Sequence, residues 1–132
     1  MAGIEKERKA MVARWGSRHF TNMLEEMFDL QKRFGGRFVD FDKLTVKGRE
    51  IWTKEFAVCC MDELSEVLNW TNFKHWKKPV YPVNELELKY ELVDLWHFVI
   101  SLMLVWKMSP EELFSMYIAK NRENHNRQKR GY

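Results

Sequence analysis

The sequence predicts an all-α protein, like a four-helix bundle, in a single domain over residues 1–132. Three observations predict this fold. Long segments carry apolar residues at helical spacing, and no segment alternates as a β-strand does. The few glycines and prolines mark places where helices should stop. A chain of 132 residues with 45% hydrophobic content suits one compact core rather than two.

The first half of the chain should hold two main helices. An amphipathic helix is expected over about residues 21–34, with a shorter charged helix before it. The pair Gly35–Gly36 ends the amphipathic helix. The stretch "RFVDFDKL" is then a loop or a brief extended piece, and a long helix runs over about residues 45–72. One face of the first helix gathers Leu24, Met27, Phe28 and Leu30.

The second half of the chain should hold two further helices. "KKPVYPVN" has two prolines in four residues and must be a connection, after which a helix runs over about residues 85–106. "MSPEEL" opens a fourth helix, with Ser109 as N-cap, Pro110 at the first helical position and Glu112 three residues after the cap. An oligomer is expected, because five tryptophans exceed what so small a core can hide: Trp52, Trp70, Trp76, Trp96 and Trp106.

The composition indicates the cellular compartment and the kind of partner to expect. No long uncharged apolar run and no secretory signal is present, and the only cysteines, Cys59 and Cys60, are adjacent. A reducing, cytoplasmic setting is therefore expected, with the two thiols as small core residues. The net charge is only +3, but five cations against one acid crowd the last 13 residues. Such a cluster favours an anion, whether nucleic acid, an acidic partner or a phosphorylated small molecule, unless it is simply a solvated tail.

Four acids stand on or beside helix faces that should pack. Glu63 lies in the middle of an apolar stripe of the second long helix, and Glu66 follows one turn later. On the next helix, Glu91 lies within an apolar stripe and Asp94 flanks it. The first stripe comprises Trp52, Phe56, Cys59, Val67 and Trp70, and the second comprises Leu88, Leu95, Phe98, Leu102 and Val105.

Converging carboxylates repel one another and are costly to desolvate, so we expect cations to neutralise them. Oxygen ligands favour Mg²⁺, with Mn²⁺ as a substitute. The alternative is four boundary residues whose heads reach water. A di-iron site would need Glu-x-x-His on two helices, whereas only Asp94 and His97 approach that spacing and Asn69 stands after Glu66. A metal cluster and a basic helix together suggest a polyphosphate substrate.

The spacing Glu63-x-x-Glu66 followed by Glu91-x-x-Asp94 resembles the metal signature of the all-α NTP pyrophosphatases, which include the MazG-like enzymes and the dimeric dUTPases. The stretches "NWTNFKHWKK", "ELVDLWHFVISL" and "YIAKNRENHNRQKRGY" resemble flanking segments of the dUTPase branch. "MFDLQKRF" is similar to the segment whose Gln contacts uracil. These matches run in order over residues 27–132.

The resemblance implies an all-α architecture completed by dimerisation, with a tetramer as the alternative. The enzyme would hydrolyse dUTP, with dUDP as a further candidate, to dUMP using Mg²⁺. The metal ligands would be Glu63, Glu66, Glu91 and Asp94, and Glu63 or Glu66 would also orient the attacking water, with Glu63 favoured. Base, nucleoside and phosphate would be contacted by Gln31, Asn69, Phe73, Lys74, Trp76, His97, Lys120, Asn124 and Arg127.

Within that set, Gln31 and Asn124 would read the base, while Phe73 and Trp76 would wall the nucleoside. Lys74, Lys120 and Arg127 would meet phosphates, and His97 would meet sugar or phosphate. Each has an ordinary alternative: Gln31 as an exposed helix residue, Phe73 and Trp76 as packing residues, Lys74 as a solvated lysine and His97 as a boundary histidine.

The sequence departs from the family in two places. Family members commonly continue past Gly-Tyr into a basic segment, whereas this sequence ends at Tyr132, and the proline-containing loop does not align. A dCTP-directed or broader dNTP pyrophosphohydrolase is therefore the alternative within the same chemistry. A helical module that binds nucleic acid through the basic C-terminus is the alternative of another class, although it leaves the four acids unexplained. A structural dimer without activity is a further one.

Overall fold

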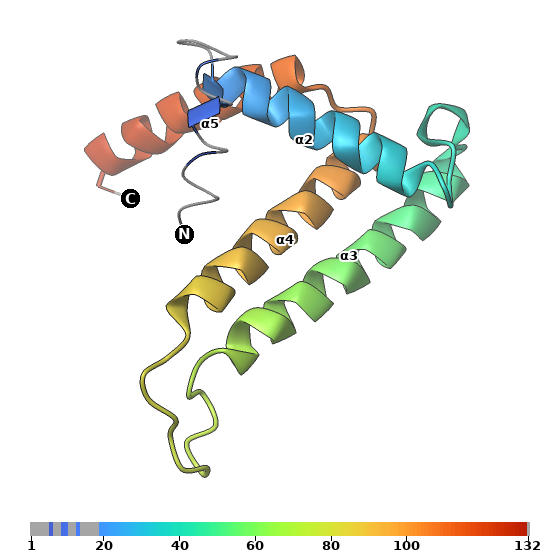
Figure 1. Ribbon diagram of the computed structural model, residues 1–132. Helices are drawn as coiled ribbons and strands as arrows, with labels where there is room; N and C mark the ends of the chain where they lie inside the picture. Colours follow the sequence, from blue (N-terminus) through green and yellow to red (C-terminus); the bar gives the residue numbers. More distant parts are fainter. Residues whose placement is uncertain (1–5, 7–8, 11–12, 14–18, 132) are drawn as a thin grey trace. The chain divides into compact units, whose positions relative to one another are not determined.

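A computed structural model of the protein describes residues 6, 9–10, 13 and 19–131. Four long helices follow one another in this part of the chain (Figure 1): α2 His19–Gly35, α3 Val46–Asn69, α4 Glu85–Val105 and α5 Pro110–Lys129. A short 3₁₀ helix, η2 Phe41–Lys43, lies in the stretch expected to be a loop or extended piece. No described residue belongs to a strand, so the predicted all-α class is confirmed. The shorter charged helix expected before residue 21 falls mostly outside the described residues.

Side-chain caps begin three of the helices, as the sequence indicates for α5. The hydroxyl oxygen of Ser109 accepts a hydrogen bond from the backbone N–H of Glu112 at 3.1 Å, and Pro110 occupies the first turn. Thr45 caps α3 and Asn84 caps α4 in the same way. At the end of α2, a Cβ on Gly35 would lie 2.6 Å from the ring of Phe41, so a larger residue there would displace this buried ring.

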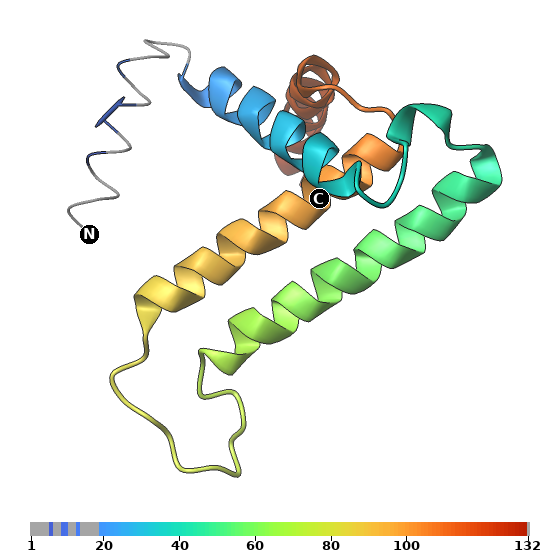
Figure 2. The same cartoon turned by 45° about the vertical axis from the view of Figure 1, so that its right-hand side comes forward.

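The described chain divides into two compact units. One comprises Gln31–Lys107, and the other takes in the described residues up to Leu30 and from Met108 onward. In the first of these, α3 and α4 form an antiparallel hairpin closed by the loop of residues 70–84 (Figures 1 and 2). The family resemblance spans both units, and the single domain expected from the sequence stays a prediction.

The core of the hairpin unit lies at the end opposite the 70–84 loop. Phe56 of α3 stacks on Phe41, with ring centroids 6.1 Å apart, and contacts the ring of Trp52 at 5.5 Å. Ile100, Leu104 and Val105 at the end of α4 are also buried. Further along the hairpin the burial decreases, so the half of the hairpin nearer the loop is the more open half.

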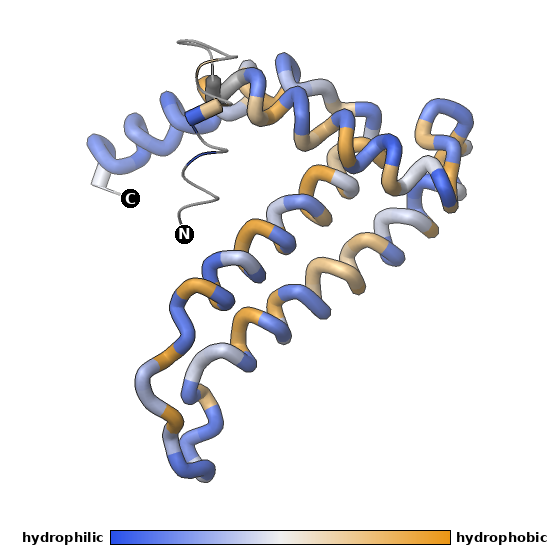
Figure 3. Tube along the Cα trace, in the orientation of Figure 1, coloured by the Kyte–Doolittle hydropathy of each residue, from blue (hydrophilic) through white to orange (hydrophobic). Residues whose placement is uncertain are grey.

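Both hairpin helices contain many apolar residues (Figure 3), and several of the apolar side chains are exposed. The exposed set on the two helices includes Val58, Met61, Leu64, Leu68, Leu92, Val93 and Trp96. Among the described residues, no single helix is both long enough and apolar enough to cross a membrane, although α4 and α5 taken together meet the length and composition criteria.

The second unit contains most of α2 together with α5. Leu24 and Phe28 of α2 are buried, as the predicted face requires, whereas Leu30 is exposed. None of the residues of α5, all of which are described, is buried. The basic residues of α5 therefore lie on an exposed helix.

Candidate metal and nucleotide site

Three of the four predicted acids come together on the α3–α4 hairpin. Glu63 of α3 and Glu91 and Asp94 of α4 each offer a carboxylate oxygen, and these oxygens lie within 4.8 Å of one another. Glu66, the fourth predicted ligand, is exposed one turn further along α3 and does not belong to this group. We call Glu63, Glu91 and Asp94 the acid cluster.

The acids occupy the positions on the helix faces that the sequence indicates. On α3, Phe56 is buried and the other members of the predicted stripe are partly buried, with partly buried Glu63 among them. On α4, Glu91 is partly buried within its apolar stripe, and Asp94 is exposed at its edge. The helical spacing therefore agrees with the positions of these three acids, and their role as metal ligands stays a prediction.

The surroundings of Glu63 disfavour the charged form of its carboxyl group. Partial burial raises the pKa of the Glu63 carboxyl, and the negative charges of Asp94 and Glu91 raise this pKa further, followed by those of Asp62 and Glu66. A bound cation would offset both effects, because it restores solvation and cancels repulsion. Oxygen-only ligands at this spacing fit a hard divalent ion such as Mg²⁺ or Mn²⁺.

One member of the cluster has a hydrogen-bonding partner that the sequence did not reveal. The indole nitrogen of Trp70, at the C-terminal end of α3, donates to Oε1 of Glu91 at 3.4 Å. In the sequence Trp70 is only a member of an apolar stripe. Its donor role follows from the register of α3 against α4, which the sequence alone does not show.

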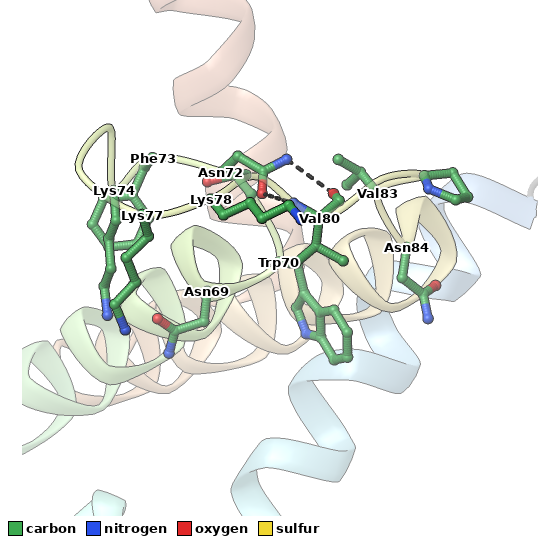
Figure 4. Close-up of a pocket in the computed structure, with 12 residues that line it drawn as sticks. Asn69, Trp70, Asn72, Phe73, Lys74, Lys77, Lys78, Val80, Val83 and Asn84 are labelled. Atoms are coloured by element: carbon green, nitrogen blue, oxygen red, sulfur yellow. Dashed lines mark hydrogen bonds between the residues drawn. The ribbon is translucent and has the colours of Figure 1, made fainter.

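A pocket of about 370 Å³ lies in the 70–84 loop (Figure 4). Asn69, Phe73 and Lys74, all predicted to bind substrate, line this pocket, and Trp70 forms part of its wall. Trp76 does not line it and is 67% exposed, so it is not a packing residue of the described chain. The lining residues that were not predicted include two further lysines, Lys77 and Lys78.

Gln31 is buried, unlike an ordinary residue on the surface of a helix. Its side chain is 5% exposed, and its amide Nε2 donates to the hydroxyl of Ser101, itself fully buried, at 2.7 Å. The interpretation of Gln31 as an exposed helix residue is therefore wrong. Its predicted contact with a base is a separate matter and stays a prediction.

The remaining predicted residues lie on α4 and α5. Nδ1 of His97 is 2.8 Å from the backbone carbonyl oxygen of Val93, and this contact needs a proton on Nδ1 because a carbonyl only accepts. Lys120, Asn124 and Arg127 are exposed residues of α5, in the other unit. There Arg127 forms an ion pair with Glu123 at 3.3 Å, and Glu123 also pairs with Arg130.

The two cysteines of α3 show no sign of reactivity. Cys59 and Cys60 are free thiols of intermediate burial. Burial is the largest cause that raises the pKa of each thiol, and Glu63 and other neighbouring charges raise both values further. A raised pKa leaves little thiolate, which agrees with their predicted role as small packing residues.

The fold and the site define an all-α protein in which two helices of a hairpin present carboxylates suited to a divalent cation. The chain belongs to the dUTPase family, whose model matches residues 23–112. This confirms the resemblance drawn from the acid spacing and its flanking segments.

Individual relatives are bacteriophage proteins. The chain is 32% identical over 115 residues to a dCTP pyrophosphatase of Enterobacteria phage T4, an alignment that covers 69% of this chain and 67% of that protein. A dCTP pyrophosphatase of Enterobacteria phage LZ5 is 47% identical over 51 residues, covering 39% of this chain and 30% of its own. A DNA replication protein of Enterobacteria phage T4 is 30% identical over 105 residues, an alignment that covers 61% of this chain and 27% of that protein. No solved structure matches the chain.

Proposed function

We propose that this chain is a Mg²⁺-dependent pyrophosphohydrolase that cleaves a pyrimidine deoxynucleoside triphosphate, dUTP or dCTP, to the monophosphate and pyrophosphate. The acid cluster of Glu63, Glu91 and Asp94 is the observation that carries the proposal. Family membership and the two dCTP pyrophosphatases support the class of nucleotide pyrophosphatase. The family description favours dUTP and the relatives' names favour dCTP, so both are expected substrates.

The chain's own residues suit this reaction. Glu63, Glu91 and Asp94 would hold Mg²⁺, which supplies charge neutralisation and an activated water when bound. Glu63 also suits the role of orienting the attacking water, because it belongs to the group of carboxylates that would hold the ion. Glu66, one turn further along α3, would be the fourth metal ligand.

Recognition of the nucleotide is assigned to residues near the cluster and on α5. Asn69, Phe73 and Lys74 line the pocket of the 70–84 loop. His97 with its proton on Nδ1 presents Nε2 as an acceptor for a sugar hydroxyl. Lys120, Asn124 and Arg127 of α5 remain the proposed contacts to phosphate and base, together with Trp76 and Gln31.

A homodimer is part of the proposal, with a tetramer as the alternative. The exposed apolar side chains of α3 and α4 support it, since monomeric proteins rarely leave so many large apolar residues on neighbouring turns uncovered. A second copy of the chain is the partner that the family resemblance implies.

A substrate panel tests the function. Purified protein is incubated with dUTP, dCTP, dTTP, dATP, dGTP or UTP, with and without Mg²⁺, and the monophosphate and pyrophosphate are quantified. We expect Mg²⁺-dependent cleavage of dUTP, dCTP or both, and a loss of about 100-fold or more in Glu63→Gln. Glu55→Gln, an isosteric change at an exposed position of the same helix, serves as the matched control.

The panel also separates the competing interpretations. Equal cleavage of all six nucleotides would keep the metal site but remove Gln31 and Asn124 as base readers. No turnover of any nucleotide would contradict the enzymatic proposal. In that case, binding to DNA or RNA that falls steeply with salt and ignores Mg²⁺ would favour the nucleic-acid-binding module.

A further inference from the structure

The pocket of the 70–84 loop is unusually cationic. Lys74, Lys77 and Lys78 all line it, and none of its lining residues in the described part of the chain is acidic. None of these three lysines forms an ion pair with a described carboxylate, whereas Lys43, Lys47 and Lys54 each do. Three ammonium groups around about 370 Å³, none paired with a described carboxylate, attract an anion of high charge.

The loop that carries these lysines is held closed by one side chain. Asn72 donates from Nδ2 to the backbone carbonyl of Val80 at 3.1 Å, and its Oδ1 accepts from the backbone N–H of Val80 at 2.9 Å (Figure 4). A further backbone bond of 2.9 Å from Lys77 N–H to the Lys74 carbonyl makes a turn inside this loop. The two ends of the lysine-bearing segment are thus held together by Asn72, whose side-chain amide supplies both a donor and an acceptor.

The pocket shares a wall with the acid cluster. Trp70 lines the pocket, and its indole nitrogen is also the hydrogen-bond donor to Glu91. Aromatic surface is available for a base as well, but the ammonium of Lys74 lies 5.6 Å from the centre of the Phe73 ring and covers that ring. The chemistry of the pocket therefore favours phosphate over base.

We propose that Lys74, Lys77 and Lys78 form a subsite for the terminal phosphates of the nucleotide and for the pyrophosphate product, and that Asn72 is the positioning residue that shapes it. This inference rests on the proposed function and extends it by two new phosphate-binding residues, Lys77 and Lys78. The α-phosphate would then lie on the side of the acid cluster, and the leaving group on the side of the lysines. The subsite would hold the negative charge that the carboxylates repel.

Calorimetric titration of pyrophosphate into the Mg²⁺-loaded protein tests the subsite. The double variant Lys77→Gln/Lys78→Gln should bind pyrophosphate roughly 100-fold more weakly, about tenfold for each lost charge-assisted contact. The matched control is Lys43→Gln/Lys47→Gln, which removes the same charge from the same unit away from the pocket and should change the affinity by less than about threefold, the effect of surface charge alone. Equal weakening in both double variants, or no binding by the unchanged protein, would overturn the subsite.

Asn72→Ala tests the positioning role, because it keeps all three lysines. We expect weaker pyrophosphate binding with unchanged Mg²⁺ affinity, and faster hydrogen exchange at the Val80 amide. A loss of Mg²⁺ affinity of the same size would indicate a general structural defect instead. The subsite and the proposed function also fail separately: lysine-dependent pyrophosphate binding without nucleotide cleavage would contradict only the function, and cleavage with an unchanged KM in Lys77→Gln/Lys78→Gln would contradict only the subsite.

Discussion

The indole N–H of Trp70 donates to a carboxylate oxygen of Glu91 at 3.4 Å, and this contact joins the end of α3 to the acid cluster on α4. Because Trp70 also lines the lysine pocket, one ring borders both the proposed metal site and the proposed phosphate subsite. A donor on one carboxylate oxygen limits the rotation of the carboxylate and leaves its other oxygen for a metal ion. Partners of this kind commonly tune metal affinity.

Trp70→Phe should therefore weaken Mg²⁺ binding by about tenfold, the low end for a hydrogen bond to a charged group, since the contact is long. Calorimetric titration of Mg²⁺ into metal-free protein measures this directly and does not depend on turnover. Trp106→Phe is the matched control, because Trp106 donates its indole N–H to the hydroxyl of Thr53 at 2.9 Å and not to a carboxylate. Equal Mg²⁺ affinities in the two variants would show that the Trp70 indole does not position Glu91.

The raised pKa of Glu63 predicts that the free energy of unfolding of the metal-free protein falls as the pH rises and Glu63 loses its proton. A folded-state pKa above the ordinary value means that the folded protein holds this proton more tightly than the unfolded chain does. The stability from this group is complete below its ordinary pKa of about 4.3 and is lost as the pH rises through the folded-state pKa. Glu63→Gln should then melt at a higher temperature than the unchanged protein at pH 7 in EDTA.

Thermal melts in EDTA between pH 4 and pH 8 test the direction of this change in melting temperature. The difference between Glu63→Gln and the unchanged protein should shrink toward pH 4, because Glu63 becomes increasingly protonated in both states. Saturating Mg²⁺ should reverse the order at pH 7, because only the carboxylate gains from the ion. Glu55→Gln should show neither trend, and a lower melting temperature for Glu63→Gln in EDTA would argue against electrostatic strain in the cluster.

Much of this structure was predictable because helices carry their own periodicity. Ser109 with Pro110 marked the start of α5, and the stripes around Glu63 and Glu91 correctly indicated which faces pack. The contribution of Lys77 and Lys78 was not predictable, since a loop between prolines has no period and its shape depends on the bonds of Asn72. The Trp70–Glu91 contact was hidden for another reason, because it depends on how two helices align with each other.

The exposed apolar side chains of the hairpin predict that a charge placed among them separates the subunits. Val58 of α3 and Leu92 of α4 are 53% and 45% exposed and do not belong to the acid cluster or the lysine pocket. Val58→Lys/Leu92→Lys should elute as a monomer by size-exclusion chromatography with light scattering, if a second copy covers these faces. Lys54→Glu, a change of charge at an exposed lysine of α3, controls for surface charge. An unchanged mass in the double variant would place the subunit contact elsewhere.

The buried hydrogen bond between Gln31 and Ser101 allows a test that distinguishes a structural role of Gln31 from a role in reading the base. Ser101→Ala should lower the free energy of unfolding by roughly 1–3 kcal/mol, because the Gln31 amide stays buried without its hydroxyl partner. Urea denaturation measures this loss, and Gln31→Met/Ser101→Ala should recover most of it, since both polar partners are then gone.

The ratio of dUTP to dCTP cleavage is then compared between these variants. A changed ratio in the double variant alone would support Gln31 as a base reader. An unchanged ratio would assign Gln31 to the core of the hairpin unit, with Asn124 of α5 left as the proposed reader of the base.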